Sequence, residues 1–337
     1  MMNAKSFLIL AGTTAVAAAL AVTSSFTWNQ TSAVAERGQM FLPTLAKNAE
    51  GIGSITIEAK DDSITLKRDG SRFLDASGYP VKRDVARDLL ASVSVLKIEE
   101  KKTSDPTRHV DLELAAPDAK DGAGKKITFL GKDGKPITGL IAGETDSSVG
   151  GVSGGQYVRA LDSDQTYLAR GSVKLPYSRA GWFDNKLIEF DAKAVASAAI
   201  ASGPGSAAKL TRVGEALKLV DLPEGKVEDP EKIRRLTRTF GKLTFSDVRK
   251  AEGTLAADAP IVTIATTDGI TFTVTSTGKD KEEAHWIRIG AAKTDESAAD
   301  KVKQLSEKFD GFEFKISSYD GNPFGWKLDD LLKTAGS

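Results

Sequence analysis

One unit occurs twice in this chain of 337 residues. The segment Ile52-Gly-Ser54-Ile55-Thr-Ile57, near the start of the first copy, corresponds to Val195-Ala-Ser197-Ala198-Ala-Ile200 in the second. Each copy closes on a Gly-Trp pair, Gly181-Trp182 and Gly325-Trp326, and the two pairs are 144 residues apart. The units of solenoid repeats run to about 20 to 50 residues, so this longer period indicates a duplicated domain.

Alternation of apolar and polar residues predicts a sheet in each copy, with a helix after the first strands. In the first copy Val85, Leu89 and Val93 recur at helical spacing and form one apolar stripe. In the second copy Asp229 and Pro230 are typical of a helix start, as an N-cap and a proline at the first helical position. Strands are expected at 52–57, 63–68, 72–74, 110–114, 126–130, 156–161, 166–168, 261–265, 270–275, 285–289 and 312–316.

These elements predict an α+β fold, in which two tandem copies of an antiparallel-sheet domain each carry one or two helices on a face. A second helix is expected only in the second copy, at 295–309. The sequence divides into a membrane anchor or signal segment, a connector, a first repeat and a second repeat, with bounds 1–35, 36–50, 51–190 and 191–337.

The amino-terminal segment predicts export. No charged residue occurs from Ser6 to Ala35, and Lys5 precedes this stretch. A membrane helix needs about 20 apolar residues, and a signal-peptide core about 7 to 15. We therefore expect an uncleaved membrane helix before the two repeats, with a cleaved signal peptide as the main alternative and a buried helix of a soluble core as the remaining one. In the first two cases everything after about residue 36 is exported.

Composition excludes several classes of function. Lys plus Arg and Asp plus Glu number 46 each, so no net field attracts nucleic acid, and no nucleic-acid partner is expected. The chain has no Cys, which removes thiolate nucleophiles and Cys-ligated metals. The two histidines, His109 and His285, lie in expected strands without partners at metal-ligand spacing. We expect no catalytic residue, no cofactor and no metal site.

Four local patterns have an alternative functional interpretation. Ser153 lies in a Gly-x-Ser-x-Gly pattern, but a strand is expected after it where a nucleophile elbow needs a helix, so a glycine-rich loop is the better interpretation. The segment 203–209 has the wrong spacing for a phosphate-binding loop. Arg234, Arg235 and Arg238 form a basic helix face that is either solvated or binds a partner. Trp182 and Trp326 are interpreted as buried aromatics that lock each domain, with ligand-stacking platforms as the alternative.

Several short motifs together resemble the bacterial domain-of-unknown-function 4340 family. They are Gly38-Gln-Met-Phe41-Leu-Pro43, Tyr79-Pro80, Lys102-Thr103-x-Asp105-Pro106, Gln156-Tyr-Val-Arg159, Tyr167-Leu168 and Gly181-Trp182-Phe-Asp184. The resemblance covers nearly the whole exported chain and implies an N-terminal membrane segment and two tandem copies. Leu112-Glu113, Phe73 and Leu217 depart from the pattern, which often has Leu-Gly or Trp at these positions.

The resemblance also implies a role. Such proteins are associated with ABC-2-type, gliding-motility-like exporters, and no catalytic residues are established for them. We therefore expect a non-enzymatic accessory subunit in the bacterial inner membrane, with its body in the periplasm or secreted there after signal cleavage. The expected partners are an ABC transporter permease, its auxiliary membrane subunits, and the inner membrane through the N-terminal helix. An exported module that binds a cell-envelope glycan or lipid is the first alternative, and a hydrolase that uses Ser153 is the second.

Overall fold

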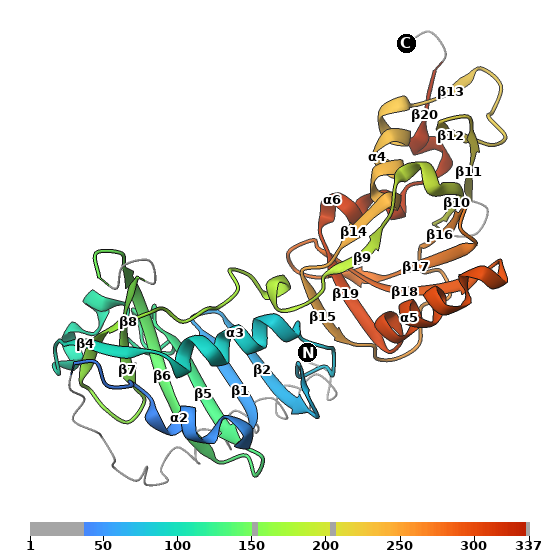
Figure 1. Cartoon of the computed structure of the whole chain (residues 1–337). Helices are drawn as coiled ribbons and strands as arrows, with labels where there is room; N and C mark the ends of the chain where they lie inside the picture. Colours follow the sequence, from blue (N-terminus) through green and yellow to red (C-terminus); the bar gives the residue numbers. More distant parts are fainter. Residues whose placement is uncertain (1–36, 150–153, 203–206, 335–337) are drawn as a thin grey trace.

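The computed structural model describes residues 37–149, 154–202 and 207–334. The fold is α+β, with two eight-stranded sheets whose strand pairs are all antiparallel. Figure 1 shows the sheets as two lobes, joined by the chain that leaves β8. The expected N-terminal membrane helix, at 1–35, lies outside the described residues. Among the helices of the described residues, none has the length and apolar character needed to cross a membrane.

The first sheet has the strand order β3-β2-β1-β5-β6-β7-β8-β4. The bounds of its strands are β1 Ile52–Ala59, β2 Asp62–Asp69, β3 Arg72–Leu74, β4 Lys97–Lys101, β5 Lys125–Gly131, β6 Pro136–Asp146, β7 Gly155–Ala160 and β8 Thr166–Arg170. The second sheet has the order β12-β11-β10-β16-β17-β18-β19-β15. The bounds of its strands are β10 Val195–Ala201, β11 Ala208–Val213, β12 Ala216–Leu219, β15 Asp247–Lys250, β16 Ile261–Thr266, β17 Ile270–Lys279, β18 His285–Lys293 and β19 Phe312–Ile316.

The two sheets place equivalent strands in equivalent positions, with β1 matching β10 and β4 matching β15. Even an irregularity is shared, because the register shifts between Ile52 and Ser54 in β1 and between Val195 and Ser197 in β10. At Gly53, inside the first shift, an added Cβ would lie 2.6 Å from the carbonyl oxygen of Gly131. The β-bulge is therefore a feature of the repeated unit and not an accident of one copy.

Each lobe has one helix of twelve residues, α3 in the first and α4 in the second. Helix α3, Arg83–Ser94, buries Ala86, Leu89 and Val93, as the apolar stripe predicts. Helix α4, Pro230–Gly241, has the predicted N-cap: the Asp229 carboxylate accepts the backbone N–H groups of Glu231 and Lys232. The remaining helices are α2 Pro43–Asn48, α5 Ala299–Phe309 and α6 Ser318–Gly321.

One expected strand was wrong, and several strands, β6 and the edge strands β4 and β15 among them, were not expected. The segment 110–114 is not a strand, because Asp105 caps a 3₁₀ turn that begins at Pro106 and a second such turn spans Val110–Leu112. The strand that follows β5 is instead β6, which the sequence did not single out. Its inner residues are buried one after another and do not alternate, so the usual signal of a half-buried strand is lacking.

Aromatic rings join the two lobes. Tyr79 follows β3 in the first lobe, and its ring meets those of Phe183, Phe245, Phe312 and Phe314 edge-on, with centroids 5.0 to 5.7 Å apart. Tyr79 itself is almost completely buried. Edge-to-face contacts of this kind add about 0.5 to 1.5 kcal/mol each beyond simple burial. We call these five residues the aromatic junction.

The chain between the lobes reinforces the aromatic junction. Trp182 is buried, and its carbonyl oxygen accepts the backbone N–H of Lys82 just before α3. A few residues on, the strand β9, Lys186–Glu189, pairs with β14, Lys242–Thr244, in the second lobe. Residues 186–189, which the sequence-based domain bounds assign to the first repeat, are therefore hydrogen-bonded to the second lobe. A further two-stranded sheet pairs β13, Lys226–Glu228, with β20, Leu332–Thr334.

Candidate functional site

A groove opens on the second sheet beside its edge strand β15. Its volume is about 640 Å³, and it lies between β15, the ends of β17 and β18, and the loop of residues 251–260. Arg249 and Lys250 line one side, and Leu255 and Pro260 of the loop line the other. We call this feature the β15 groove. Its volume is within the range of about 300 to 1,000 Å³ that is usual for small-molecule sites.

A buried carboxylate forms the floor of the β15 groove. Glu313 on β19 is only 4% exposed, and each of its oxygens binds a different arginine. Glu313 Oε2 accepts Arg249 Nε at 2.8 Å and Nη2 at 2.6 Å. Glu313 Oε1 accepts Arg288 Nε at 3.0 Å and Nη2 at 2.9 Å. Each arginine thus donates two N–H groups to one carboxylate oxygen, and these four charge-assisted hydrogen bonds compensate the burial of the charge and orient both guanidinium groups.

Other contacts hold the two arginines in place. The guanidinium carbon of Arg249 lies 4.0 Å from the centre of the Trp286 ring, a close cation–π contact. Arg288 Nη2 donates to the carbonyl oxygen of Glu252 at 2.6 Å, and this ties the loop to the sheet. The positions of both guanidinium groups are therefore set before any ligand arrives, which lowers the entropic cost of binding one.

The equivalent place in the first lobe has a threonine, Thr166, in place of Glu313. The strand match places Lys102, Arg159 and Thr166 where Arg249, Arg288 and Glu313 lie in the second lobe. Thr166 donates its hydroxyl to the carbonyl oxygen of Thr103 at 2.8 Å, and Gln165 Nε2 donates to three backbone carbonyls in the same place. The first lobe thus has a hydrogen-bonded threonine where the second lobe has a carboxylate between two arginines, while Lys102 pairs with Glu100 and Arg159 Nη1 donates to the carbonyl oxygen of Ser163.

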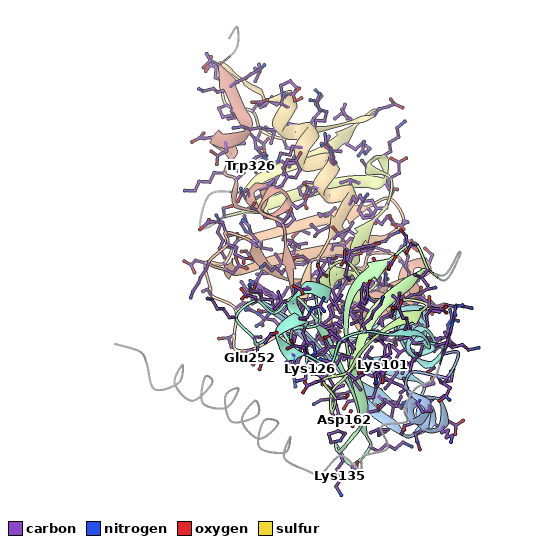
Figure 2. The ribbon with its side chains drawn as sticks, turned by 90° about the vertical axis from the view of Figure 1, so that its left-hand side faces the viewer. Lys101, Lys126, Lys135, Asp162, Glu252 and Trp326 are labelled. Atoms are coloured by element: carbon purple, nitrogen blue, oxygen red, sulfur yellow. The ribbon has the colours of Figure 1, made fainter. Side chains whose placement is uncertain are left out.

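A second cluster of cations and rings lies on α4. Arg235 covers the ring of Tyr319 at 4.3 Å and that of Trp326 at 5.3 Å, and Lys232 lies 5.7 Å from the Trp326 ring. Arg238 Nη1 donates to the Tyr319 hydroxyl at 3.3 Å. Figure 2 shows Trp326 and Glu252 at different ends of the second lobe, so this cluster and the β15 groove are separate surfaces.

The two repeated tryptophans differ in their surroundings. Trp182 is 5% exposed and fits the interpretation of a buried aromatic lock. Trp326 is only half-buried, and the side chains of Lys232 and Arg235 cover its ring. The basic helix face predicted from Arg234, Arg235 and Arg238 is partly used inside the molecule, since Arg234 pairs with Glu231 and the other two bind Tyr319.

The remaining candidates from the sequence do not form a site in the described residues. Ser153 and residues 203–206 lie outside them, although β7 begins at Gly155, so a strand follows the Ser153 motif. His109 Nε2 lies 2.9 Å from the carbonyl oxygen of Asp164, and His285 Nε2 lies 2.9 Å from Asn322 Oδ1. His109 lies between two 3₁₀ turns and not in an expected strand. No group of three or more His, Asp or Glu side chains in the described part of the chain is placed to hold a metal ion.

Sequence analysis missed the β15 groove. Arg249 and Glu313 are 64 positions apart and meet only because β15 pairs with β19. The one available signal was the duplication itself, since Thr166 and Glu313 differ in charge at matching positions.

These features define a two-lobed α+β protein that has a preorganised polar groove in its second lobe. The family model described as Domain of unknown function (DUF4340) matches residues 72–260. The match covers more than half of the chain and runs from β3 to the end of the groove loop. The chain belongs to this family. Comparison with curated proteins gives no match.

Proposed function

We propose that this protein is a non-enzymatic accessory subunit of an ABC-type transporter of the ABC-2, gliding-motility-like kind. One N-terminal span would hold it in the bacterial inner membrane, with both lobes in the periplasm. The observation that carries the proposal is the aromatic junction, where Tyr79 of the first lobe is enclosed by rings of the second lobe and of the chain between them. A buried junction fixes the spacing of the lobes, as a scaffold between an anchor and a partner requires.

Two features of the chain support the proposal. The uncharged stretch from Ser6 to Ala35 has Lys5 before it, which favours a span whose amino end stays in the cytoplasm. Duplication of a whole sheet unit provides a large surface for partners, such as a permease and its auxiliary subunits. Membership of the family is consistent with this role, because the resemblance implies the same accessory function.

The topology is tested by a fusion of alkaline phosphatase after Ser337. The enzyme is active only outside the cytoplasm, so we expect an active fusion in intact cells. A fusion that is expressed at full length but is inactive would overturn the orientation. A variant with Lys5 and the stretch 6–35 deleted is the control and is expected to be inactive.

The partner is tested by chemical crosslinking in membranes, followed by purification of the full-length chain and identification of what is attached. A transporter permease is expected in the wild-type sample. It should be lost from a Tyr79→Ala sample, in which the junction is broken but the anchor is intact. Recovery of the chain at normal levels without any permease would contradict the proposal.

The second candidate is an exported module that binds a cell-envelope glycan or lipid. The β15 groove favours it, because the two arginines on Glu313 and the exposed Leu255 line a hollow of ligand size. The anchor separates the two candidates. A transporter subunit needs the 1–35 segment to remain attached, whereas a binding module functions after cleavage.

A further inference from the structure

The β15 groove has donors that the protein itself does not use. Arg249 directs Nε and Nη2 to Glu313, while its Nη1 makes no hydrogen bond within the described residues. Lys250, the next residue on β15, has no ion-pair partner among those residues either. The hydroxyl oxygen of Thr277, which also lines the groove, has no hydrogen-bond partner in the described part of the chain. The unused cationic donors of Arg249 and Lys250 are suited to an anionic oxygen group.

The opposite wall has a different character. Leu255 is 41% exposed, and Ala256, Ala259 and Pro260 continue the same apolar surface. A leucine this exposed provides a contact for the apolar part of a ligand. The walls therefore differ, with cations on the strand and carbon on the loop.

The charged residues of the β15 groove limit how many anionic groups a ligand can have. The groove is also lined by Glu252, Asp258 and the already paired Glu313. Three cationic residues, Arg249, Lys250 and Arg288, face these three carboxylates, so the groove has no large net charge. A ligand with several anionic groups would be repelled by Glu252 and Asp258. A ligand with a single anionic group is accommodated next to Arg249 and Lys250.

We propose that the β15 groove binds a small molecule that has one anionic oxygen group, phosphate or carboxylate, on an apolar chain or ring. The anionic group lies at Arg249 and Lys250, and the apolar part lies on the Leu255 wall. Glu313 acts as a positioning residue that holds both guanidinium planes. The inference goes beyond the proposed accessory role and does not depend on it, because binding to a purified chain needs no transporter.

The comparison of the two lobes supports a ligand site over a purely structural ion cluster. The same position in the first lobe has no carboxylate between its two cations, and Thr166 and Gln165 bind backbone carbonyls there. The fold of the repeat therefore does not need a glutamate that bridges two arginines at this place. A buried carboxylate with two arginines is an expensive way to achieve stability alone, because desolvation offsets much of the Coulomb attraction.

The test uses a photolabel, decyl phosphate with a diazirine in its alkyl chain, and the full-length chain in discs of neutral lipid. After irradiation, the labelled peptides are mapped by mass spectrometry. We expect the label to concentrate in residues 249–260. The same diazirine chain ending in a hydroxyl group is expected to leave these residues almost unlabelled, and inorganic phosphate is expected to compete only weakly, because it lacks the apolar part.

Variants give the decisive comparison. Lys250→Gln removes an unpaired cation, and we expect labelling to fall about tenfold, as for one charge-assisted hydrogen bond. Leu255→Asn should also reduce labelling, because it removes the apolar contact for the alkyl chain on the loop side of the groove. Lys303→Gln, at an exposed position on α5, is the matched control and should label like the wild type. Arg249→Gln is expected to abolish labelling, but it also leaves Glu313 with only one arginine and can unfold the protein. If the Arg249→Gln protein unfolds, the test of the inference rests on Lys250→Gln.

Three results would overturn the inference. The alcohol could label residues 249–260 as well as the phosphate does, or Lys250→Gln and Leu255→Asn could both label like the wild type. Inorganic phosphate could also compete fully, which would mean that the apolar wall has no part in binding. None of these results bears on the transporter association, which is tested separately by crosslinking.

Discussion

Arg68 and Arg212 make the same hydrogen bond in the two lobes. Each donates from Nη2 to the carbonyl oxygen of an alanine that begins a 3₁₀ turn, Ala49 at 3.3 Å and Ala192 at 2.6 Å. The turn leads into the first strand of each sheet. The duplicated unit has thus kept a side chain that closes the entry to its central strands, and this contact links the sequence repeat to the structural one.

The two arginines are not equally important for stability. Arg212 also donates to the carbonyl oxygens of Val195 and Glu215, whereas Arg68 Nε is buried without a hydrogen-bond partner in the described residues. We predict that Arg212→Met lowers the free energy of unfolding by about 2 to 3 kcal/mol, because the partly buried carbonyls of Val195 and Ala192 lose their donor. Arg68→Met should cost about 1 kcal/mol. Denaturant unfolding of both variants checks the order, and a larger loss for Arg68→Met would contradict it.

Tyr79 makes the stability depend on pH above neutrality. Burial raises the pKa of its phenol above the ordinary value of 10.0, and the carboxylates of Asp184 and Asp75 raise it further. Above about pH 10 the unfolded chain loses this proton while the folded chain keeps it, so stability falls as pH rises. The loss reaches up to about 1.4 kcal/mol per pH unit.

Replacement of this one tyrosine tests the effect. Tyr79→Phe should be less sensitive to pH than the wild type in thermal unfolding between pH 9 and 11, two values chosen on either side of the ordinary tyrosine pKa of about 10. Tyr177→Phe is the matched control, because Tyr177 is fully exposed on the connector between the lobes. Equal pH dependence in the Tyr79→Phe and Tyr177→Phe variants would show that the aromatic junction does not titrate as described.

Truncation of the two tryptophans should have unequal effects. Trp182→Ala removes a buried ring and should cost about 3 to 5 kcal/mol, which threatens a domain of about 5 to 15 kcal/mol in total stability. Trp326→Ala removes a half-buried ring and should cost less, about 1 to 2 kcal/mol. Thermal unfolding of both variants measures the difference. Equal losses would restore the expectation that both tryptophans lock their domains in the same way.

Ser153→Ala tests the hydrolase alternative. A substitution away from buried partners usually changes stability by less than about 0.5 kcal/mol. We predict that the variant folds normally and supports growth or transport like the wild type. Loss of function in a folded Ser153→Ala protein, together with stable tryptophan variants, would favour the hydrolase over the scaffold.

Local sequence signals predicted the parts of the fold that depend on local chemistry. The N-cap at Asp229 and Pro230 placed the start of α4, and the apolar stripe placed α3. Alternation in β1 and β2 was visible because one face of each strand is buried and the other is more open. Propensity and periodicity act within a few residues, so these elements could be found without tertiary information.

The features that the sequence did not predict depend on tertiary contacts. Strand β6 contains Gly139 and Gly143, where an added Cβ would lie 2.6 Å from the carbonyl oxygen of Ile127 and 2.1 Å from that of Leu112. Glycine has low strand propensity, and here it is required by close approach of other backbone, which a sequence alone does not reveal. The β15 groove was not predicted for a similar reason, because its charged residues come from strands that are distant in sequence.

Arg179 connects the two lobes by hydrogen bonds to both. Its Nη1 donates to Asp62 Oδ1 at 3.2 Å in β2, and its Nε donates to Asp247 Oδ1 at 2.5 Å in β15. Asp62 is largely exposed, so most of the contribution comes from Asp247, and we expect Arg179→Gln to cost about 1 kcal/mol in unfolding experiments. Its main effect should be on the arrangement of the lobes.

Because the chain has no Cys, spin labels can be attached at two introduced positions alone, Lys135→Cys in the first lobe and Lys303→Cys in the second. Electron–electron distance measurements should give a narrow distribution in the otherwise wild-type chain, as the aromatic junction requires. Arg179→Gln should broaden it moderately, and Tyr79→Ala should broaden it more, because the latter removes the ring at the centre of the junction. Arg72→Gln, which breaks only an exposed pair with Asp69, is the control and should leave the distribution unchanged. A broad distribution before any substitution would mean that the lobes move independently, and a scaffold of fixed spacing would then be ruled out.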